Sequence, residues 1–377
     1  MPCWDILASR FPVSALPAQT DTFALCPSSI VELQEILQLV SAHGEQMGIC
    51  GNGSKLHWRS MPSILVSTRN LPAVLDHAVD DLTVTVSAGT PYQELQTYLA
   101  KTKQFLAIDP PYPHQCTIGG IIGSGMTGSL RHRYGGVRDM VLGIEFLRSD
   151  GVMARAGGKV VKNVAGYDLM KLLTGAWGTL AIVTAVTLRL YPLPPHQESW
   201  IIAGAPFQLK NLLSRLWRSG LTPTIVDLFS PRERGGELLI QFTGMVAGVT
   251  AQGQQLQHLV QASGDLSITK LDHAPPAPLY SQPSPLLLVK IAILPSYAPD
   301  LIYQFPPFPM QIHAGSGIGW VRIDPHHLPM LDTFCSLRKG YVQVLFPNTA
   351  QRSPMLSPLL SQRLKQQLDR SSIFPSL

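Results

Sequence analysis

The residues of this chain whose type and spacing could bind a ligand lie in two glycine-rich stretches. The first is Gly51-Asn-Gly-Ser, followed at once by Lys55, and the second is the run from Gly119 to Gly128. Glycine lets a backbone approach a ligand closely and direct successive N–H groups into one concavity, which suits an anion such as a pyrophosphate. Because a glycine motif is weak evidence by itself, an ordinary glycine-rich loop stays open as the alternative.

Neither stretch matches the common nucleotide-binding fingerprints. The spacing Gly-x4-Gly-Lys-Ser/Thr of a Walker loop is absent around Gly51 to Lys55, and no third glycine opens a helix there as a Rossmann motif requires. The sequence therefore predicts an anion site of another kind.

Length and composition bound the possible functions. The chain has 377 residues, which favours two domains, and 45% hydrophobic against 14% charged residues, which excludes a disordered chain. The net charge of +5 is modest and no basic run is interleaved with aromatic residues, so nucleic acid is not an expected partner.

The cysteines predict neither a metal site nor an iron–sulfur cluster. There are five, widely scattered, and no pair has Cys-x-x-Cys spacing. They fit free thiols in a reducing compartment. The first residues lack the pattern of a signal peptide and no apolar run is long enough to span a membrane. We therefore expect a cytoplasmic protein, at most peripheral on the inner face of a membrane through partners.

Several elements are expected to position the first glycine stretch. Ser29-Ile-Val-Glu32 forms a capping box before an amphipathic helix that ends at Gly44. A short buried strand, Met47–Cys50, then runs directly into the Gly51 turn. Further strands are expected at Ile64–Ser67 and Leu82–Ser87.

The second glycine stretch is also framed by predicted elements. A second capping box, Thr90-Pro-Tyr-Gln93, precedes a helix that ends near Lys101. After the glycine run, Met140–Arg148 and Val152–Arg155 form a hairpin. A brief helix at Leu169–Leu173 and a long strand at Leu180–Leu190 follow.

The composition changes after about His196, and prolines crowd the segment between Pro275 and Pro309, which suggests a linker. A small α+β layer is predicted by strand, helix and strand signals in order. These signals, with two later strands and a terminal amphipathic helix, lie at Glu237–Gly244, Gln254–Gln261, Leu266–Leu271, Leu286–Leu294, Gly319–Ile323 and Pro354–Leu368.

Taken together, the motifs resemble those of FAD-linked oxidases of the vanillyl-alcohol-oxidase/PCMH type. The order and spacing of four segments carry this resemblance over about residues 45–195: Gly51-Asn-Gly-Ser, Thr117-Ile-Gly-Gly, Lys162-Asn-Val-Ala-Gly-Tyr-Asp-Leu and Gly178-Thr-Leu. Within that family the chain resembles the FAD-binding E subunits of glycolate oxidase (glycolate dehydrogenase). The segments Gly125-Met-Thr-Gly, Val137-Arg-Asp-Met-Val-Leu-Gly and Leu364-Lys-Gln-Gln-Leu-Asp-Arg-Ser-Ser-Ile-Phe-Pro are the ones that look like those subunits.

The resemblance implies an α+β fold: a two-lobed PCMH-type FAD-binding domain with a smaller α+β cap domain. The implied boundaries are residues 1–195 for the FAD-binding domain, 196–340 for the cap with its proline-rich linker, and 341–377 for a C-terminal segment that returns to the FAD-binding domain. The tail lacks the Asn-Pro-Gly-Arg that is customary after Ile373-Phe374, which puts its closing contact in doubt.

The resemblance also implies the cofactor and its contacts. The resemblance implies that FAD is non-covalent, because a serine, Ser54, stands where covalent relatives carry the linking histidine. Backbone donors of the first glycine turn and of the Thr117–Gly128 segment would hold the pyrophosphate. The implied FAD-binding residues are Gly51, Asn52, Gly53, Ser54, Lys55, Pro110, Thr117, Ile118, Gly119, Gly120, Gly123, Ser124, Gly128, Gly135, Val137, Asn163, Gly166, Tyr167, Gly178 and Ile182.

A catalytic site is not evident in the sequence. Oxidation of a 2-hydroxy acid requires a base for the hydroxyl proton and a cation for the carboxylate. Catalytic relatives place paired histidines and a carboxylate in the cap, whereas here His313, in Ile312-His-Ala-Gly-Ser-Gly, is a weak candidate without such neighbours. A buried thiol at Cys116 is expected to act as a small hydrophobe rather than in redox chemistry.

Three functions therefore remain open. The first is the FAD-binding subunit of a heteromeric glycolate dehydrogenase that works with an FAD-containing catalytic D-type subunit and an iron–sulfur F-type subunit, with glycolate as substrate of the complex. The second is a self-sufficient FAD-dependent dehydrogenase of a 2-hydroxy acid or alcohol. The third is a flavin-binding assembly subunit without a redox role.

Overall fold

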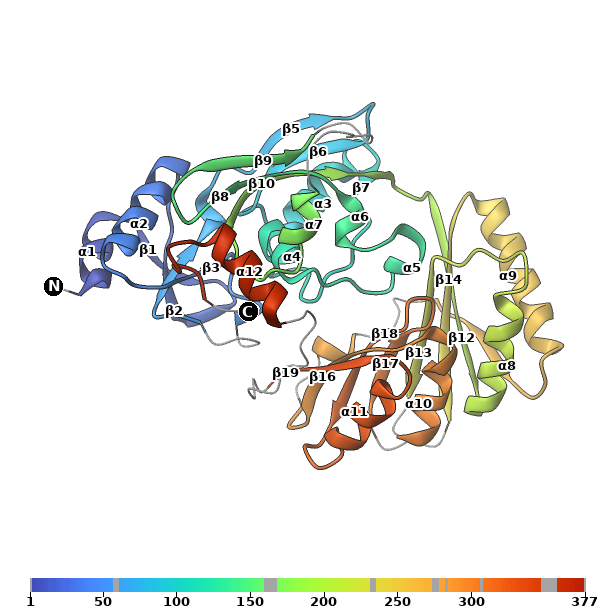
Figure 1. The fold of residues 1–377 in the computed structure, drawn as a ribbon. Helices are drawn as coiled ribbons and strands as arrows, with labels where there is room; N and C mark the ends of the chain where they lie inside the picture. Colours follow the sequence, from blue (N-terminus) through green and yellow to red (C-terminus); the bar gives the residue numbers. More distant parts are fainter. Residues whose placement is uncertain are drawn as a thin grey trace. The chain divides into compact units, whose positions relative to one another are not determined.

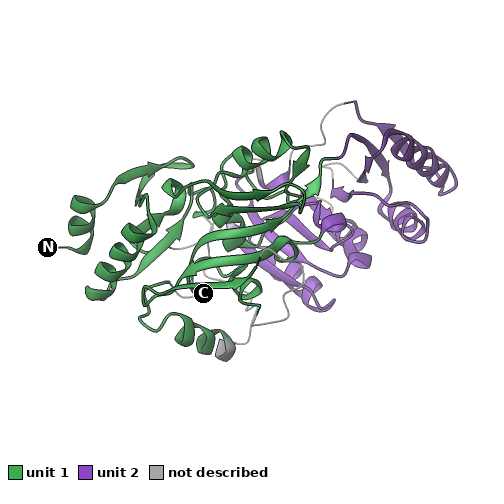
Figure 2. Cartoon of the chain, turned by 90° about the horizontal axis from the view of Figure 1, so that it is seen from above, with its two compact units in different colours: residues 1–127, 135–193, 354–377 green, residues 128–134, 194–353 purple. Residues whose placement is uncertain are grey.

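The computed structural model describes residues 2–56, 61–158, 168–230, 235–272, 278–281, 284–305, 308–346 and 358–375. Helices and sheets are mixed along the chain, which confirms the predicted α+β class. The chain divides into two compact units (Figure 2): unit 1 comprises residues 1–127, 135–193 and 354–377, and unit 2 comprises 128–134 and 194–353.

The first lobe of unit 1 carries a four-stranded sheet with the order β1-β2-β4-β3, in which β3 and β4 are parallel. Its core also takes in Ile373 and Phe374 from the end of the chain. The elements of this lobe are α1 (Cys3–Arg10), β1 (Val13–Leu16), β2 (Gln19–Leu25), α2 (Ile30–Ala42), β3 (Met47–Cys50) and β4 (Ile64–Ser67) (Figure 1).

Helix α2 forms largely as the sequence predicts. Its buried face repeats at helical spacing, the Ser29 side chain accepts the Glu32 N–H, and Gly44 takes a φ of 65° just past the helix end. The second hydrogen bond of the predicted capping box differs. The Glu32 carboxylate accepts the N–H of Ser28 rather than that of Ser29.

The second lobe of unit 1 is built on a five-stranded antiparallel sheet with the order β5-β6-β10-β8-β9. The predicted hairpin is present as β8 and β9. The elements are β5 (Val74–Ala78), β6 (Thr83–Ser87), α3 (Tyr92–Ala100), β7 (Gln104–Phe105), α4 (Ile118–Ser124), α6 (Val137–Met140), β8 (Val141–Leu147), β9 (Met153–Gly157), α7 (Leu169–Leu173), β10 (Ile182–Arg189) and β11 (Tyr191–Pro192).

The second predicted capping box is wrong. Pro91 is the N-cap of α3 rather than its first residue, and no side chain caps this helix. The hydroxyl of Thr90 instead donates to the carbonyl of Ala73, 3.0 Å away, and so does not cap the helix.

Unit 2 is one eight-stranded antiparallel sheet with the order β15-β12-β14-β13-β17-β18-β16-β19. Helices α8, α9, α10 and α11 contribute to the apolar core on one face. The elements are α5 (Arg131–Tyr134), β12 (His196–Gly204), α8 (Pro206–Leu216), β13 (Ile225–Ser230), β14 (Gly236–Gly244), α9 (Val246–Gln261), β15 (Ser267–Lys270), β16 (Leu287–Ala292), α10 (Ala298–Gln304), β17 (Met310–His313), β18 (Ile318–Ile323), α11 (Leu328–Ser336) and β19 (Tyr341–Phe346).

The opposite face of this sheet carries buried polar side chains among apolar ones. Alternation along the strands places Asp227 of β13 beside His313 of β17, and Gln311 of β17 beside Trp320 of β18. Asp227, Gln311 and His313 are all buried. Unit 2 therefore carries a buried polar layer on the sheet face away from its helices.

The unit boundaries differ from the expected ones at two places. Strand β19 joins the sheet of unit 2, so this unit extends past residue 340, and the short segment 128–134 belongs to it although unit 1 flanks that segment in sequence. The proline-rich stretch is not a linker, because β16 and α10 lie in it and Pro299 stands in the first turn of α10. Within the described residues, no helix is both long enough and apolar enough to cross a membrane.

Candidate flavin site

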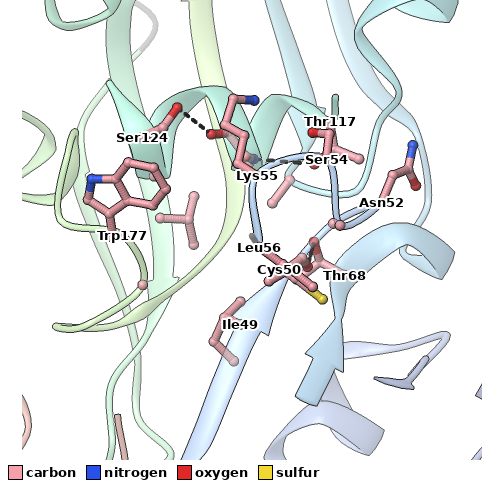
Figure 3. Close-up of a pocket in the computed structure, with 18 of the residues that line it drawn as sticks. Ile49, Cys50, Asn52, Ser54, Lys55, Leu56, Thr68, Thr117, Ser124 and Trp177 are labelled. Atoms are coloured by element: carbon pink, nitrogen blue, oxygen red, sulfur yellow. Dashed lines mark hydrogen bonds between the residues drawn. The ribbon is translucent and has the colours of Figure 1, made fainter. Parts of the chain in front are cut away.

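A pocket in unit 1 gathers many of the residues singled out in the sequence (Figure 3). Its walls come from the end of β3 and the turn after it, from α4, and from the loop between α7 and β10. The predicted residues that line it are Gly51, Asn52, Gly53, Ser54, Lys55, Thr117, Gly119, Gly120, Gly123, Ser124 and Gly178.

Neighbouring side chains pack closely against the turn from Gly51 to Lys55. The Gly51 carbonyl accepts the Ser67 hydroxyl at 2.8 Å, and a Cβ on Gly51 would lie only 2.1 Å from the Thr117 Oγ1 atom. Gly53 has a φ of 85°, a conformation that favours glycine. Only glycine therefore fits the turn at these two positions.

The backbone amides of this turn are available to a ligand. Among the described residues, the N–H groups of Asn52, Gly53, Ser54 and Lys55 have no hydrogen-bond acceptor, whereas the Asn52 carbonyl accepts the Ala18 N–H. A row of amides beside a concavity is a fit for phosphate oxygens.

The Lys55 side chain brings a buried cation to the same place. Its Nζ atom is enclosed and has no hydrogen-bond partner among the described residues, and burial lowers the pKa of its ammonium group. The nearby Cys116 thiol opposes that shift only weakly, since burial raises the pKa of this thiol as well. A buried cation without a counter-ion is costly, so an anionic ligand would satisfy it.

The second glycine stretch differs from the expected anion nest, because residues Ile118–Ser124 form helix α4. Its first amides are used within the protein: Ile118 donates to Thr90, Gly119 to Ala88, and Gly120 to the Thr117 hydroxyl. This helix can therefore meet a ligand through its Cα atoms and side chains rather than through those three N–H groups. The Ser124 hydroxyl donates to the Gly120 carbonyl at 2.8 Å; Thr117 and Ser124 are labelled in Figure 3.

The glycines of α4 serve two different contacts. A Cβ on Gly119 would lie 2.8 Å from the Ala88 Cβ atom, so this glycine allows the helix to pack on the backbone of Ala88. A Cβ on Gly120 would meet only the Thr117 Oγ1 atom, at 3.4 Å, while Gly120 lines the pocket. Gly120 therefore leaves space for a ligand rather than for a neighbouring element.

The opposite wall is a strained loop that hydrogen-bonds to α4. The Gly175 and Trp177 N–H groups donate to the carbonyls of Ile122 and Gly123 at 2.9 and 2.8 Å. Trp177 has a φ of 55° and Gly178 a φ of 70°, and both line the pocket. Non-glycine residues with such angles cost energy and tend to cluster at functional sites.

Sequence reasoning missed the apolar part of the lining. Trp177 had a signal, because a large aromatic residue directly precedes the Gly178-Thr-Leu motif, whereas the others are ordinary core types without one. The lining residues that were missed are Ile49, Cys50, Leu56, Met61, Thr68, Ala88, Leu173, Ala176, Trp177 and Val183.

Some predicted site residues lie elsewhere. Six do not line the pocket, and among them Ile118, Val137 and Ile182 are buried in the packing of the unit. The other three of these six are Pro110, Gly128 and Gly135. Asn163, Gly166 and Tyr167 lie outside the described residues.

His313 lies in unit 2, in the buried polar layer. Its Nδ1 atom is 2.8 Å from the Asp227 carboxylate and 3.2 Å from the Ser129 hydroxyl. Asp227 also accepts hydrogen bonds from Ser129 at 2.5 Å and from Gln311 at 3.1 Å. Because serine and carboxylate meet the same imidazole nitrogen, this is not the arrangement in which histidine activates a serine nucleophile through its other nitrogen.

Residues 22–157 match the family described as FAD binding domain. Along 93% of its length the chain is 26% identical to the glycolate oxidase subunit GlcE of Escherichia coli (strain K12), and the match covers 96% of that protein. The chain is thus similar to FAD-linked oxidoreductases, both in its FAD-binding segment and, at lower identity, along almost its whole length.

Further comparisons place this oxidoreductase more broadly. It is 32% identical to the glycolate oxidase subunit GlcD of Bacillus subtilis (strain 168) over 46% of the chain, and spans only 38% of that protein. A solved alkyldihydroxyacetonephosphate synthase has the same fold, with a TM-score of 0.70 and 15% identity over 93% of the chain and 75% of its own.

FAD is the cofactor of this FAD-linked oxidoreductase, and the pocket in unit 1 fits such a group. The amides of the Gly51 turn and the Lys55 ammonium suit the negative pyrophosphate, and the apolar lining that includes Trp177 and Leu173 suits flat rings.

Proposed function

We propose that this chain is the FAD-binding subunit of a heteromeric glycolate dehydrogenase, which oxidises glycolate to glyoxylate and relays electrons between subunits. The observation that carries the proposal is the similarity to GlcE, which spans 96% of that subunit rather than the FAD-binding segment alone. Expected partners are an FAD-containing D-type subunit and an iron–sulfur F-type subunit. Through them the chain would work in the cytoplasm or at the inner face of a membrane.

In this proposal the residues of the chain bind and orient a non-covalent flavin. The amides of Asn52 to Lys55 and the Lys55 ammonium hold the pyrophosphate, and Gly120 leaves room for it. Ser54, in the position where covalent relatives carry a histidine, offers a hydroxyl that forms no bond to the flavin ring. When bound, FAD supplies the capacity to accept and pass on electrons.

The remaining chemistry is assigned to the partners. Among the described residues no cluster of histidine, cysteine and carboxylate side chains could hold a metal ion. His313 is 2% exposed, with Nδ1 engaged by Asp227 and Ser129, so it is poorly placed to remove a substrate proton. General-base catalysis contributes about 10²–10⁴-fold, so a chain without it should be slow even with flavin bound.

The first test is the colour and chemistry of the purified chain. We expect a yellow protein whose FAD is released into the supernatant by acid precipitation. Flavin that stays with the pellet would contradict non-covalent binding, and a colourless chain that cannot be reconstituted with FAD would contradict the cofactor site itself.

The second test is anaerobic mixing of the flavin-loaded chain with glycolate or D-lactate while the visible flavin absorbance is followed. We expect no prompt bleaching by the chain alone, and bleaching when the D-type and F-type subunits are co-purified. Prompt bleaching by the lone chain that is lost in His313→Ala would make it a self-sufficient 2-hydroxy-acid dehydrogenase. Flavin binding without any effect on the activity of the complex would indicate an assembly role.

A further inference from the structure

The C-terminal segment of the chain folds against the strand that leads into the flavin pocket. The Met47 N–H, at the start of β3, donates to the Ile373 carbonyl at 2.9 Å, and the Gln46 side chain donates to the Ser372 carbonyl at 3.2 Å. Ile373 and Phe374 are fully buried in the core of the first lobe. The segment, red in Figure 1, is therefore an integral part of unit 1.

A buried carboxylate shapes the end of this segment. The side chain of Asp369, fully enclosed, accepts the N–H groups of Ile373 and Phe374 at 3.0 Å each. Lys365, one turn earlier on α12 (Pro358–Leu368), places its ammonium 2.5 Å from the same carboxylate. Because a buried carboxylate is tolerated when it is paired and hydrogen-bonded, the pair fixes the path of the last residues.

The same ammonium group reaches across to the pocket wall. Lys365 Nζ donates to the Thr179 carbonyl at 2.7 Å, and also to the carbonyls of Phe374 and Pro375. Thr179 directly follows Trp177 and Gly178, both of which line the pocket. One cation thus joins the tail to the strained loop of the flavin site.

The loop is consequently held at two ends. On one side the Gly175 and Trp177 amides donate to α4, and on the other side the Thr179 carbonyl accepts from Lys365. The positive φ angle of Trp177 is costly for a residue with a side chain and persists because the surroundings enforce it. A loop that is already fixed in its binding conformation loses less entropy when a ligand arrives.

We propose that Lys365 and Asp369 are positioning residues of the flavin pocket, which set the Trp177–Thr179 loop and strand β3 in the conformation that binds the cofactor. The inference rests on the assignment of this pocket to FAD. It does not require either residue to touch the flavin.

The first experiment compares FAD affinity and bound-flavin circular dichroism among four proteins. Lys365→Met together with Asp369→Asn removes both charges without leaving either one buried alone, and Lys365→Arg keeps the cation. Lys171→Met is the matched control, because Lys171 forms a similar 2.5 Å pair with Asp168 that is more than half exposed. We expect the double variant to bind FAD at least tenfold more weakly with an altered visible dichroism, Lys365→Arg to recover most of the affinity, and the control to match wild type.

A purely structural role would give a different result. If the double variant melts at a lower temperature but its folded fraction binds FAD with wild-type affinity and dichroism, the inference is overturned. If the wild-type chain binds FAD but Lys55→Met does not weaken it, the pocket assignment fails instead, which separates the two ideas.

A second measurement uses the wild-type chain and does not depend on how the variants fold. Coupling between two sites is reciprocal, so a tail that organises the pocket must itself be stabilised when FAD binds. We expect FAD to slow amide hydrogen exchange in residues 370–375 as well as in 175–179. Slower exchange in the loop with unchanged exchange in the tail would overturn the inference.

Discussion

The Nδ1 atom of His313 lies 2.8 Å from a carboxylate oxygen of Asp227, and both side chains are almost completely buried. Ser129 joins the pair from segment 128–134, which follows the flavin-pocket helix α4 in sequence but belongs to unit 2. His313, which the sequence offered as a candidate for catalysis, thus helps to hold segment 128–134 in unit 2. A catalytic role for His313 is a hypothesis that the His313→Ala variant tests in the anaerobic mixing experiment.

Removing the Asp227 carboxylate should destabilise unit 2. Asp227→Ala leaves the donors of Ser129, Gln311 and His313 without their shared acceptor, so we expect a loss of about 3–5 kcal/mol in the free energy of unfolding. Urea titration measures this. Asp300→Ala is the control, because that carboxylate pairs with Lys210 at the surface and should matter little. A stability near wild type for Asp227→Ala would show that the buried layer is dispensable.

Two neighbouring glycines of α4 should respond differently to valine. Gly120→Val should keep the fold and weaken FAD binding at least about tenfold, because its side chain would occupy ligand space. Gly119→Val should lower the stability of the chain itself by about 1–3 kcal/mol, because its Cβ would press on Ala88. Fluorescence titration with FAD and thermal melting separate the two effects, and equal effects on both quantities would contradict the assignment.

Replacing Lys55 should have opposite effects on stability and on binding. Burial lowers the pKa of this ammonium group, so burying it costs folding free energy that Lys55→Met removes. The flavin-free variant should therefore be more stable than wild type. FAD affinity should fall by about 10–150-fold, the equivalent of one hydrogen bond to a charged group. A variant that is less stable without flavin, or that binds FAD normally, would refute a phosphate-binding role.

Lys290 should give unit 2 a pH-dependent stability. Burial, with Arg131 as a second cause, lowers the pKa of Lys290 from 10.5 to about 8. Below pH 8 both folded and unfolded chains carry the proton, and the folded state bears the full cost of the buried charge. Between pH 8 and 10.5 the folded state releases it first, so the cost declines as the pH rises.

Lys290→Met should therefore stabilise the protein most at pH 7 and progressively less toward pH 10. One pKa unit corresponds to about 1.4 kcal/mol, and partial contact with solvent reduces the full value, so we expect a gain of about 1–3 kcal/mol at pH 7. Lys210→Met, at an exposed pair with Asp300, serves as the control. Urea titrations at pH 7 and pH 10 measure the free energy of unfolding of each variant. A stabilisation by Lys290→Met that grows with pH would contradict the lowered pKa of Lys290.

Local signals in the sequence predicted local structure well. Helix α2 with its Ser29 cap, strand β3 with the turn at Gly51, and helix α7 could be found because short-range spacing and turn chemistry decide them. The FAD-binding family could be named because several such motifs occur in a fixed order. The same local signals also predicted most of the pocket residues on the Gly51 turn and on α4.

Long-range contacts decided the rest. The second glycine stretch has poor helix propensity, yet it becomes helix α4 because Gly119 packs against Ala88 on another element. Nothing near Lys55 in sequence shows that its ammonium is buried without a partner, and nothing near Ser129 shows that it bonds to a residue almost one hundred positions away. Such features appear only once the elements are packed together.

The burial of Phe374 in the first lobe has a consequence for how the protein is made. Apart from Ile373 and Phe374, this core consists of residues between Cys3 and Ile182, so the ribosome synthesises nearly all of it long before these last two components. The N-terminal part of unit 1 must therefore wait, incompletely closed, while the whole of unit 2 is translated. Chaperones have their longest opportunity to act on it during that interval, and cofactor loading becomes a step that follows translation.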